Sequence, residues 1–78
     1  MNVLVTDEDI LEVHVLIERL AATRSLQGLT RSVVAHKMRI HEHTMSALEK
    51  ENMDPQLSLL QGYARALGGH IQIRFVNK

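Results

Sequence analysis

Cysteine and tryptophan are absent from this chain of 78 residues, proline occurs once, and aromatic side chains make up 3% of the total. The absence of cysteine excludes a disulfide-stabilised scaffold and a zinc module with thiolate ligands. A charged residue or a histidine interrupts every apolar run, so no membrane-spanning segment is expected. Asp7 precedes the first basic residue, which is not typical of a signal peptide. We therefore expect residues 1–78 to form one small cytoplasmic domain.

The sequence also has few features of an enzyme or a metalloprotein. It contains no glycine-rich phosphate loop, no cysteine nucleophile and no pair of carboxylates placed for catalysis, so we predict a protein without catalytic activity or cofactor. His41 and His43 lie two positions apart, and on a helix their side chains would diverge by about 200°. They are therefore unsuited to share one ion, and no metal site is predicted.

Net charge is absent as well, but charge is unevenly distributed. Nine Lys and Arg balance nine Asp and Glu, which excludes binding to polyanions through overall charge. Residues 1–18 nevertheless contain five acidic residues and no Lys or Arg, whereas residues 19–39 contain five Lys or Arg and no acidic residue. A local basic block of this kind can contact phosphates, although ordinary solvated helix faces give the same pattern.

Apolar periodicity and turn residues predict a mostly helical fold with four helices. Thr6 has the position of an N-cap, and the helix after it is expected to end before Gly28. Thr30 can cap a second helix that runs to about Met38, and a third is expected over residues 41–52.

Asp54 and Pro55 give a start signal for the fourth helix, as N-cap and first helical residue, and Gly68 is expected to end it. After Gly69 the apolar period changes to two, which predicts a strand over residues 70–76. A shorter alternation near the N-terminus also allows an N-terminal strand.

The predicted core consists of the apolar positions that recur at helical spacing. They are Ile10, Val13, Ile17, Leu20 and Ala21 in the first helix, Val34, Ala35 and Met38 in the second, Met45 and Leu48 in the third, and Leu57, Leu60, Ala64 and Leu67 in the fourth. Leu11 and Val15 lie off the stripe of the first helix, which predicts a second contact for that helix.

Two short helices joined by two residues, after a longer helix, are typical of a helix-turn-helix motif, which we place at residues 30–52. Plain helical bundles also contain such pairs. The residues in and around the motif, however, resemble the Cro/repressor-type (XRE) family over positions 17–68 without a gap. The matching positions are Gly28, Leu29, Thr30, Val34, Ala35, Met38, Ile40, Thr44, Met45, Leu48, Glu49, Pro55, Leu57, Leu60, Ala64, Ala66, Leu67 and Gly68.

The resemblance implies a lambda-repressor-like bundle and a sequence-specific repressor that binds double-stranded DNA, as a dimer on a palindromic operator. It also implies a partly buried ion pair between Arg24 and Glu49. The tail at residues 67–75 resembles HigA- and HipB-like antitoxins, which bind toxin as well as DNA. We therefore expect a bacterial or phage-encoded, nucleoid-associated protein, either a phage-type repressor or an antitoxin that represses its own operon.

Three positions depart from the family pattern. Arg39 replaces the usual glycine of the turn and could require either a left-handed backbone or a slightly different turn. Arg31 replaces the usual glutamine at the start of the second helix, where it could pair with phosphate. Glu51 replaces a glycine that often follows the recognition helix.

A helical wheel with Met45 and Leu48 inward places a polar face toward DNA. Glu42 could accept a hydrogen bond from cytosine, and Ala47 could contact a thymine methyl group. His43 could donate to guanine or contact phosphate. The predicted DNA-binding residues are Thr30, Arg31, Glu42, His43, Ser46, Ala47 and Lys50. The alternative is a protein-interaction module of the same fold, a toxin-binding antitoxin with weak or no DNA binding, which the zero net charge, Glu42 and Ala47 favour.

The predicted C-terminal strand is the candidate dimerisation element. A lone strand leaves backbone groups unpaired, so it must pair either with Asn2–Thr6 of its own chain or with its copy in a second chain. We favour pairing between chains, because Ile71, Ile73 and Phe75 form a self-complementary apolar row and the family binds DNA as dimers.

Overall fold

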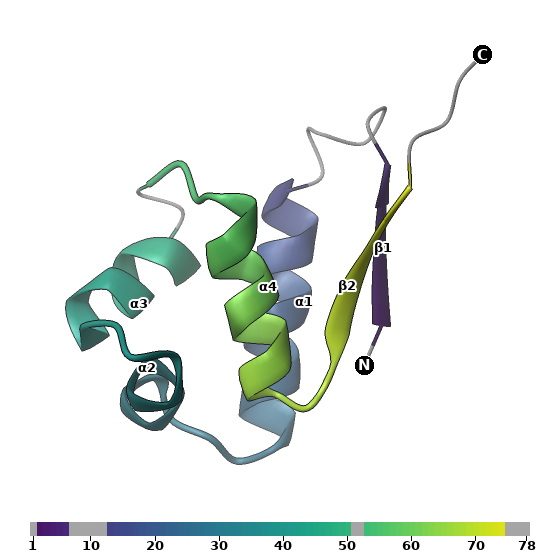
Figure 1. Cartoon of the computed structure of the whole chain (residues 1–78). Coiled ribbons are helices and arrows are strands. Elements are labelled where there is room, and N and C mark those ends of the chain that lie inside the picture. Colours follow the sequence, from purple (N-terminus) through teal and green to yellow (C-terminus); the bar gives the residue numbers. More distant parts are fainter. Residues whose placement is uncertain (1, 7–12, 51–52, 75–78) are drawn as a thin grey trace.

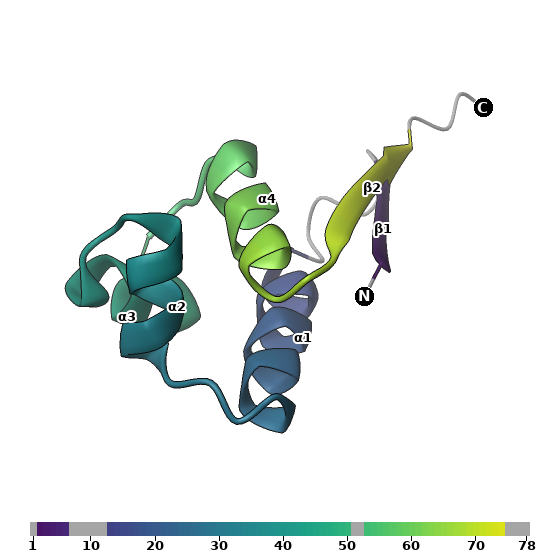
Figure 2. The ribbon, with the colours of Figure 1, turned by 60° about the horizontal axis from the view of Figure 1, so that its bottom comes forward.

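The computed structural model describes residues 2–6, 13–50 and 53–74. Its elements are β1 (Asn2–Thr6), α1 (Val13–Leu26), α2 (Arg31–Met38), α3 (Glu42–Glu49), α4 (Leu57–Ala66) and β2 (His70–Arg74). Helices α1 and α4 lie side by side, with α2 and α3 on one side of them and the two strands on the other (Figures 1 and 2). This arrangement confirms the predicted helix-turn-helix bundle with a C-terminal strand. The predicted start of the first helix, with Ile10 and Leu11, lies outside the described residues.

Helix α2 begins and ends at the residues that the sequence indicates. The Thr30 side chain accepts a hydrogen bond from the backbone N–H of Val33 at 3.2 Å and so caps the helix. Arg39 follows the helix with φ 58° and ψ 42°, the left-handed conformation expected for this turn. The Ile40 N–H then donates to the carbonyl of Ala35 at 3.0 Å, which closes the end of the helix.

Because a left-handed backbone is unfavourable for a residue with a Cβ, we expect Arg39→Gly to stabilise the fold by about 0.5–1 kcal/mol. Lys37→Gly is the matched control, since Lys37 is an exposed residue inside α2. There glycine should destabilise the protein by up to about 1 kcal/mol. Thermal unfolding followed by circular dichroism measures both changes. Effects of the same sign would show that the conformation of Arg39 carries no strain.

The prediction that Asp54 caps the fourth helix and Pro55 begins it is wrong. Helix α4 begins at Leu57, and Gln56 occupies the N-cap position without a side-chain hydrogen bond. The N–H groups of Leu59 and Leu60 both donate to the carbonyl of Gln56. Proline fixes φ at a value that suits extended chain as well as a helix, so Asp54-Pro55 fits the approach to α4 equally well. Gly68, with φ 86°, follows the helix end as predicted.

The buried core contains one apolar stripe from each helix and one residue of β2. Its members are Leu16, Ile17, Leu20, Val34, Ala35, Met45, Leu48, Leu60, Tyr63, Ala64, Leu67 and Ile71. Leu16 and Tyr63 were not predicted to be buried, and they complete stripes with i, i+3, i+4, i+7 spacing. Leu57, predicted as a core residue, is 46% exposed because it lies at the edge of the α4 stripe. Val15 is 49% exposed, so the described residues do not form the second contact predicted for it.

Strands β1 and β2 pair in parallel within the chain, with Val3 opposite Ile71 and Val5 opposite Ile73. The preference for a partner strand from a second chain is therefore wrong for this edge of β2. The four helices between the strands supply the long crossover that parallel pairing requires, so residues 2–6 can reach β2. Phe75, the third residue of the proposed apolar row, lies outside the described residues.

Candidate nucleic-acid interface

Helices α2 and α3 form a unit on the side of the bundle that lies away from the strands (Figure 2). The residues between them, 39–41, turn the chain sharply because Arg39 is left-handed. Val34 of α2 and Met45 and Leu48 of α3 are fully buried, and they fix the two helices against the rest of the core. This is the geometry of a helix-turn-helix motif.

The polar face predicted for α3 lies at the surface. Glu42, His43 and Lys50 are exposed, whereas Ser46 and Ala47 are half-buried between them and the core. Thr30 and Arg31, at the start of α2, are also exposed. All seven predicted DNA-binding residues therefore belong to the two helices of the motif or to their caps.

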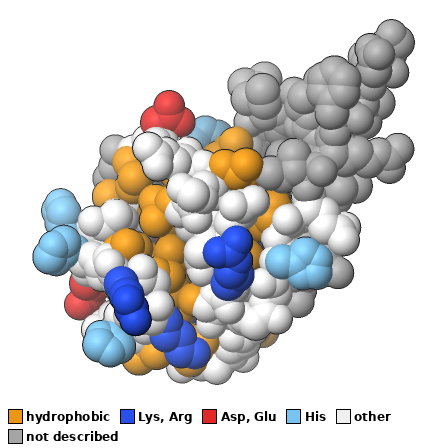
Figure 3. Space-filling view, viewed as in Figure 1, with side chains coloured by type: hydrophobic (Ala, Val, Ile, Leu, Met, Phe, Trp, Pro, Cys, Tyr) orange, Lys and Arg blue, Asp and Glu red, His pale blue; other side chains and the backbone are white. Residues whose placement is uncertain are grey.

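Basic and histidine side chains gather over α2 and α3 (Figure 3). The exposed members of this group in the described part of the motif are Arg31, His36, Lys37, Arg39, His41, His43 and Lys50. The four Lys or Arg of this group outnumber Glu42, the one exposed acidic residue in the described part of the motif, which gives a locally positive surface on a chain whose formal net charge is zero. Such a surface attracts the phosphate backbone of a nucleic acid.

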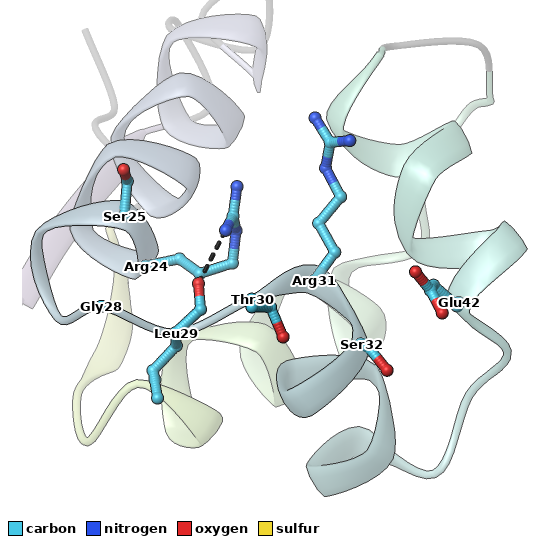
Figure 4. Close-up of a pocket in the computed structure, with 8 residues that line it drawn as sticks. All are labelled: Arg24, Ser25, Gly28, Leu29, Thr30, Arg31, Ser32 and Glu42. Carbon is cyan, nitrogen blue, oxygen red and sulfur yellow. Dashed lines mark hydrogen bonds between the residues drawn. The ribbon is translucent and has the colours of Figure 1, made fainter.

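An open hollow of about 480 Å³ lies between the end of α1, the start of α2 and the start of α3 (Figure 4). Arg31 lines it from the start of α2, and Glu42 lines it from the start of α3. Thr30 and Ser32 add hydroxyl groups to its wall. The hollow brings together three of the seven predicted residues, Thr30, Arg31 and Glu42.

Behind this surface, four helices meet at the carboxylate of Glu49, whose side chain is 3% exposed. Arg24 of α1 donates from Nε to Oε2 at 2.8 Å and from Nη2 to Oε1 at 3.1 Å. Arg31 of α2 donates from Nε to Oε1 at 2.7 Å. The Tyr63 hydroxyl of α4 donates a short hydrogen bond to Oε2. We call Arg24, Arg31, Glu49 and Tyr63 the Glu49 cluster.

The electrostatics of the Glu49 cluster keep the carboxylate charged. Burial by itself raises the pKa of Glu49, but hydrogen bonds from Arg24, Tyr63 and Arg31 outweigh burial and lower the pKa below its usual value. The hydrogen bond to Glu49 raises the pKa of Arg24. Burial and the adjacent carboxylate raise the pKa of Tyr63, so its hydroxyl remains a donor. The cluster therefore contains one anion and two cations.

The expected ion pair between Arg24 and Glu49 is present, but the sequence did not predict its two additional partners. Arg31, predicted to pair with phosphate, also contacts Glu49. Tyr63 lies on the buried stripe of α4 but was not among the predicted core residues. A buried tyrosine requires a partner for its hydroxyl, and this requirement could have identified it.

Among the residues that the structure describes, no group of three or more His, Cys, Asp or Glu is placed to hold a metal ion. No helix in that part of the chain has the length and apolar character needed to cross a membrane.

The fold and this surface define a helix-turn-helix protein. Residues 19–74 match the model of a helix-turn-helix domain family, and the chain belongs to that family. It is also similar to the protein named Antitoxin HigA1 in Mycobacterium tuberculosis strains CDC 1551 / Oshkosh and H37Rv. Each comparison gives 41% identity over 68 residues, which cover 87% of this chain and 46% of the relative. The chain thus spans about half the length of these curated relatives. No solved structure matches it.

Proposed function

We propose that the chain is a sequence-specific transcriptional repressor that places α3 in the major groove of DNA. The observation that carries this proposal is the exposed polar face of α3, supported by the buried residues Met45 and Leu48 and by the Glu49 cluster. Recognition helices of this motif read base edges from such a face. The family match at residues 19–74 supports the same function.

Each residue of this face has a role that suits its chemistry. Glu42 accepts from a cytosine amino group, His43 donates to guanine or phosphate, and Ala47 contacts a thymine methyl group. Ser46 lies beside them on the same face. Three other residues (Thr30, Arg31 and Lys50) contact backbone phosphates and set the position of α3 on the duplex.

The similarity to proteins named Antitoxin HigA1 supports a more specific proposal. We propose that the chain is an autoregulating antitoxin without catalytic activity, which binds a toxin protein and represses its own operon in the cytoplasm. We propose that it binds a palindromic operator as a homodimer. The second edge of β2, to which no described strand is paired, is available for a partner strand at Ile71 and Ile73.

A second candidate is a protein-interaction module that retains the fold without binding DNA. The zero net charge and the carboxylate of Glu42 on the exposed face favour it. An anion at that position repels phosphate unless it is paired with a base amino group.

Titration of the wild-type protein against a mixed-sequence duplex separates the two candidates. Two cationic phosphate contacts in each protomer predict that affinity falls about tenfold per protomer between about 50 and 200 mM salt. Fluorescence anisotropy of a labelled duplex measures this dependence. An interaction module would give no binding at either salt concentration.

A further inference from the structure

The guanidinium group of Arg31 is hydrogen-bonded to Glu49 through its Nε atom alone. Its Nε donates to Glu49 Oε1 at 2.7 Å, whereas its side chain is 43% exposed. No other hydrogen bond of this group is formed within the part of the chain that the structure describes. The two terminal amino groups, Nη1 and Nη2, therefore remain as four donor hydrogens on a residue that lines the hollow between the end of α1 and the starts of α2 and α3 (Figure 4).

The charges of the Glu49 cluster do not cancel. Two guanidinium groups, of Arg24 and Arg31, share one carboxylate, which leaves an excess of one positive charge. Arg24 is the more buried of the two, with its side chain 15% exposed, and its Nη1 donates to the carbonyl of Leu29 at 2.7 Å. The excess charge is consequently presented to solvent by Arg31.

The carboxylate that holds Arg31 is itself fixed. Arg24 binds both of its oxygens, and the Tyr63 hydroxyl binds Oε2, so the carboxylate plane has little freedom to rotate. A planar guanidinium attached to a fixed acceptor loses part of its own freedom before any ligand arrives. Binding a ligand then costs less entropy than it would for a free side chain.

We propose that Glu49 is a positioning residue for DNA binding, which orients Arg31 so that Nη1 and Nη2 bind a backbone phosphate while Nε stays on the carboxylate. This inference rests on the proposed function. Glu49 is buried and does not touch DNA, but it affects the affinity for DNA by orienting Arg31. The same residue thus joins the packing of the four helices to the phosphate contact.

Comparison of Arg31→Lys with Arg31→Gln tests the proposal. A lysine ammonium keeps the charge, but it lacks the fork that could bind carboxylate and phosphate together. We expect both variants to bind a mixed-sequence duplex about tenfold more weakly than the wild type, because each loses a charge-assisted contact. Arg31→Gln should also reduce the slope of log affinity against log salt by about one.

Arg65→Lys and Arg65→Gln are the matched controls, since Arg65 is an exposed arginine of α4 outside the motif. Both should bind within about twofold of the wild type. If Arg31→Lys retained wild-type affinity, charge alone would suffice and the orienting role of Glu49 would be refuted. An unchanged salt slope for Arg31→Gln would refute the phosphate contact. If the wild type bound no duplex, the proposed function and this inference would fail together, an outcome distinct from the other two.

Discussion

Glu49→Ala is expected to lower the free energy of unfolding by about 3–5 kcal/mol, because it leaves the Arg24 guanidinium and the Tyr63 hydroxyl without their partner in the interior. A small domain has a total stability of about 5–15 kcal/mol, so this single change removes a large share of it. Urea unfolding followed by circular dichroism measures the loss. Glu42→Ala is the matched control on the same helix, and it should cost no more than about 1 kcal/mol. A similar small cost for Glu49→Ala would show that the cluster contributes little to the fold.

The pH dependence of stability separates the charge of Glu49 from its packing. Burial acts to raise the pKa of Glu49, but the hydrogen bonds from Arg24, Tyr63 and Arg31 prevail, so the pKa in the folded state is below the value of about 4.3 in an unfolded chain. The unfolded state therefore takes up a proton first as the pH falls. The stabilisation is fully present above that value and is lost as the pH falls through the lower, folded pKa. Glu49→Gln should remove this part of the acid dependence.

His43→Glu is expected to weaken DNA binding at least about 100-fold, because it places a second carboxylate beside Glu42 on the face that meets phosphates and base edges. The fold should be unaffected. His43 is exposed, and a carboxylate in the first turn of a helix interacts favourably with the helix dipole. Anisotropy with a mixed-sequence duplex measures the affinity, and circular dichroism verifies the fold.

His70→Glu is the control for this change, because His70 is an exposed histidine of β2 outside the motif. It should bind within about twofold of the wild type. Equal losses for the two variants would mean that overall charge, rather than the face of α3, determines affinity. No loss for His43→Glu would remove this residue from the interface.

The sequence predicted the helices well where apolar spacing and turn chemistry agree. Thr30 and Gly68 were assigned correctly. A threonine hydroxyl just before a helix caps its N-terminus, and a glycine just after a helix adopts the left-handed conformation that ends it. The start of α4 was assigned wrongly because Asp54-Pro55 suits two backbone conformations. Of the two partners considered for the C-terminal strand, the wrong one was favoured, since the same row of side chains can face its own chain or a copy of it.

The exposed positions of the site on one helix face could be predicted from the sequence. The contacts of the Glu49 cluster behind that face could not all be predicted. Helical spacing places Glu42, His43 and Lys50 at the surface whatever lies behind them. The contacts of Arg31 and Tyr63 with Glu49 join residues that are 18 and 14 positions apart, and they depend on how α2 and α4 cross α3. Local sequence patterns carry no information about such crossings.

In the proposed complex, the exposed face of α3 and the start of α2 contact DNA. Amide chemical shifts of the isotope-labelled protein, recorded by NMR as a mixed-sequence duplex is added, test these contacts residue by residue. We predict the largest shift changes at Ser32, Glu42, His43 and Lys50, with Arg65 of α4 nearly unchanged. Changes confined to α4 and β2, with the amides of α3 unaffected, would contradict the account.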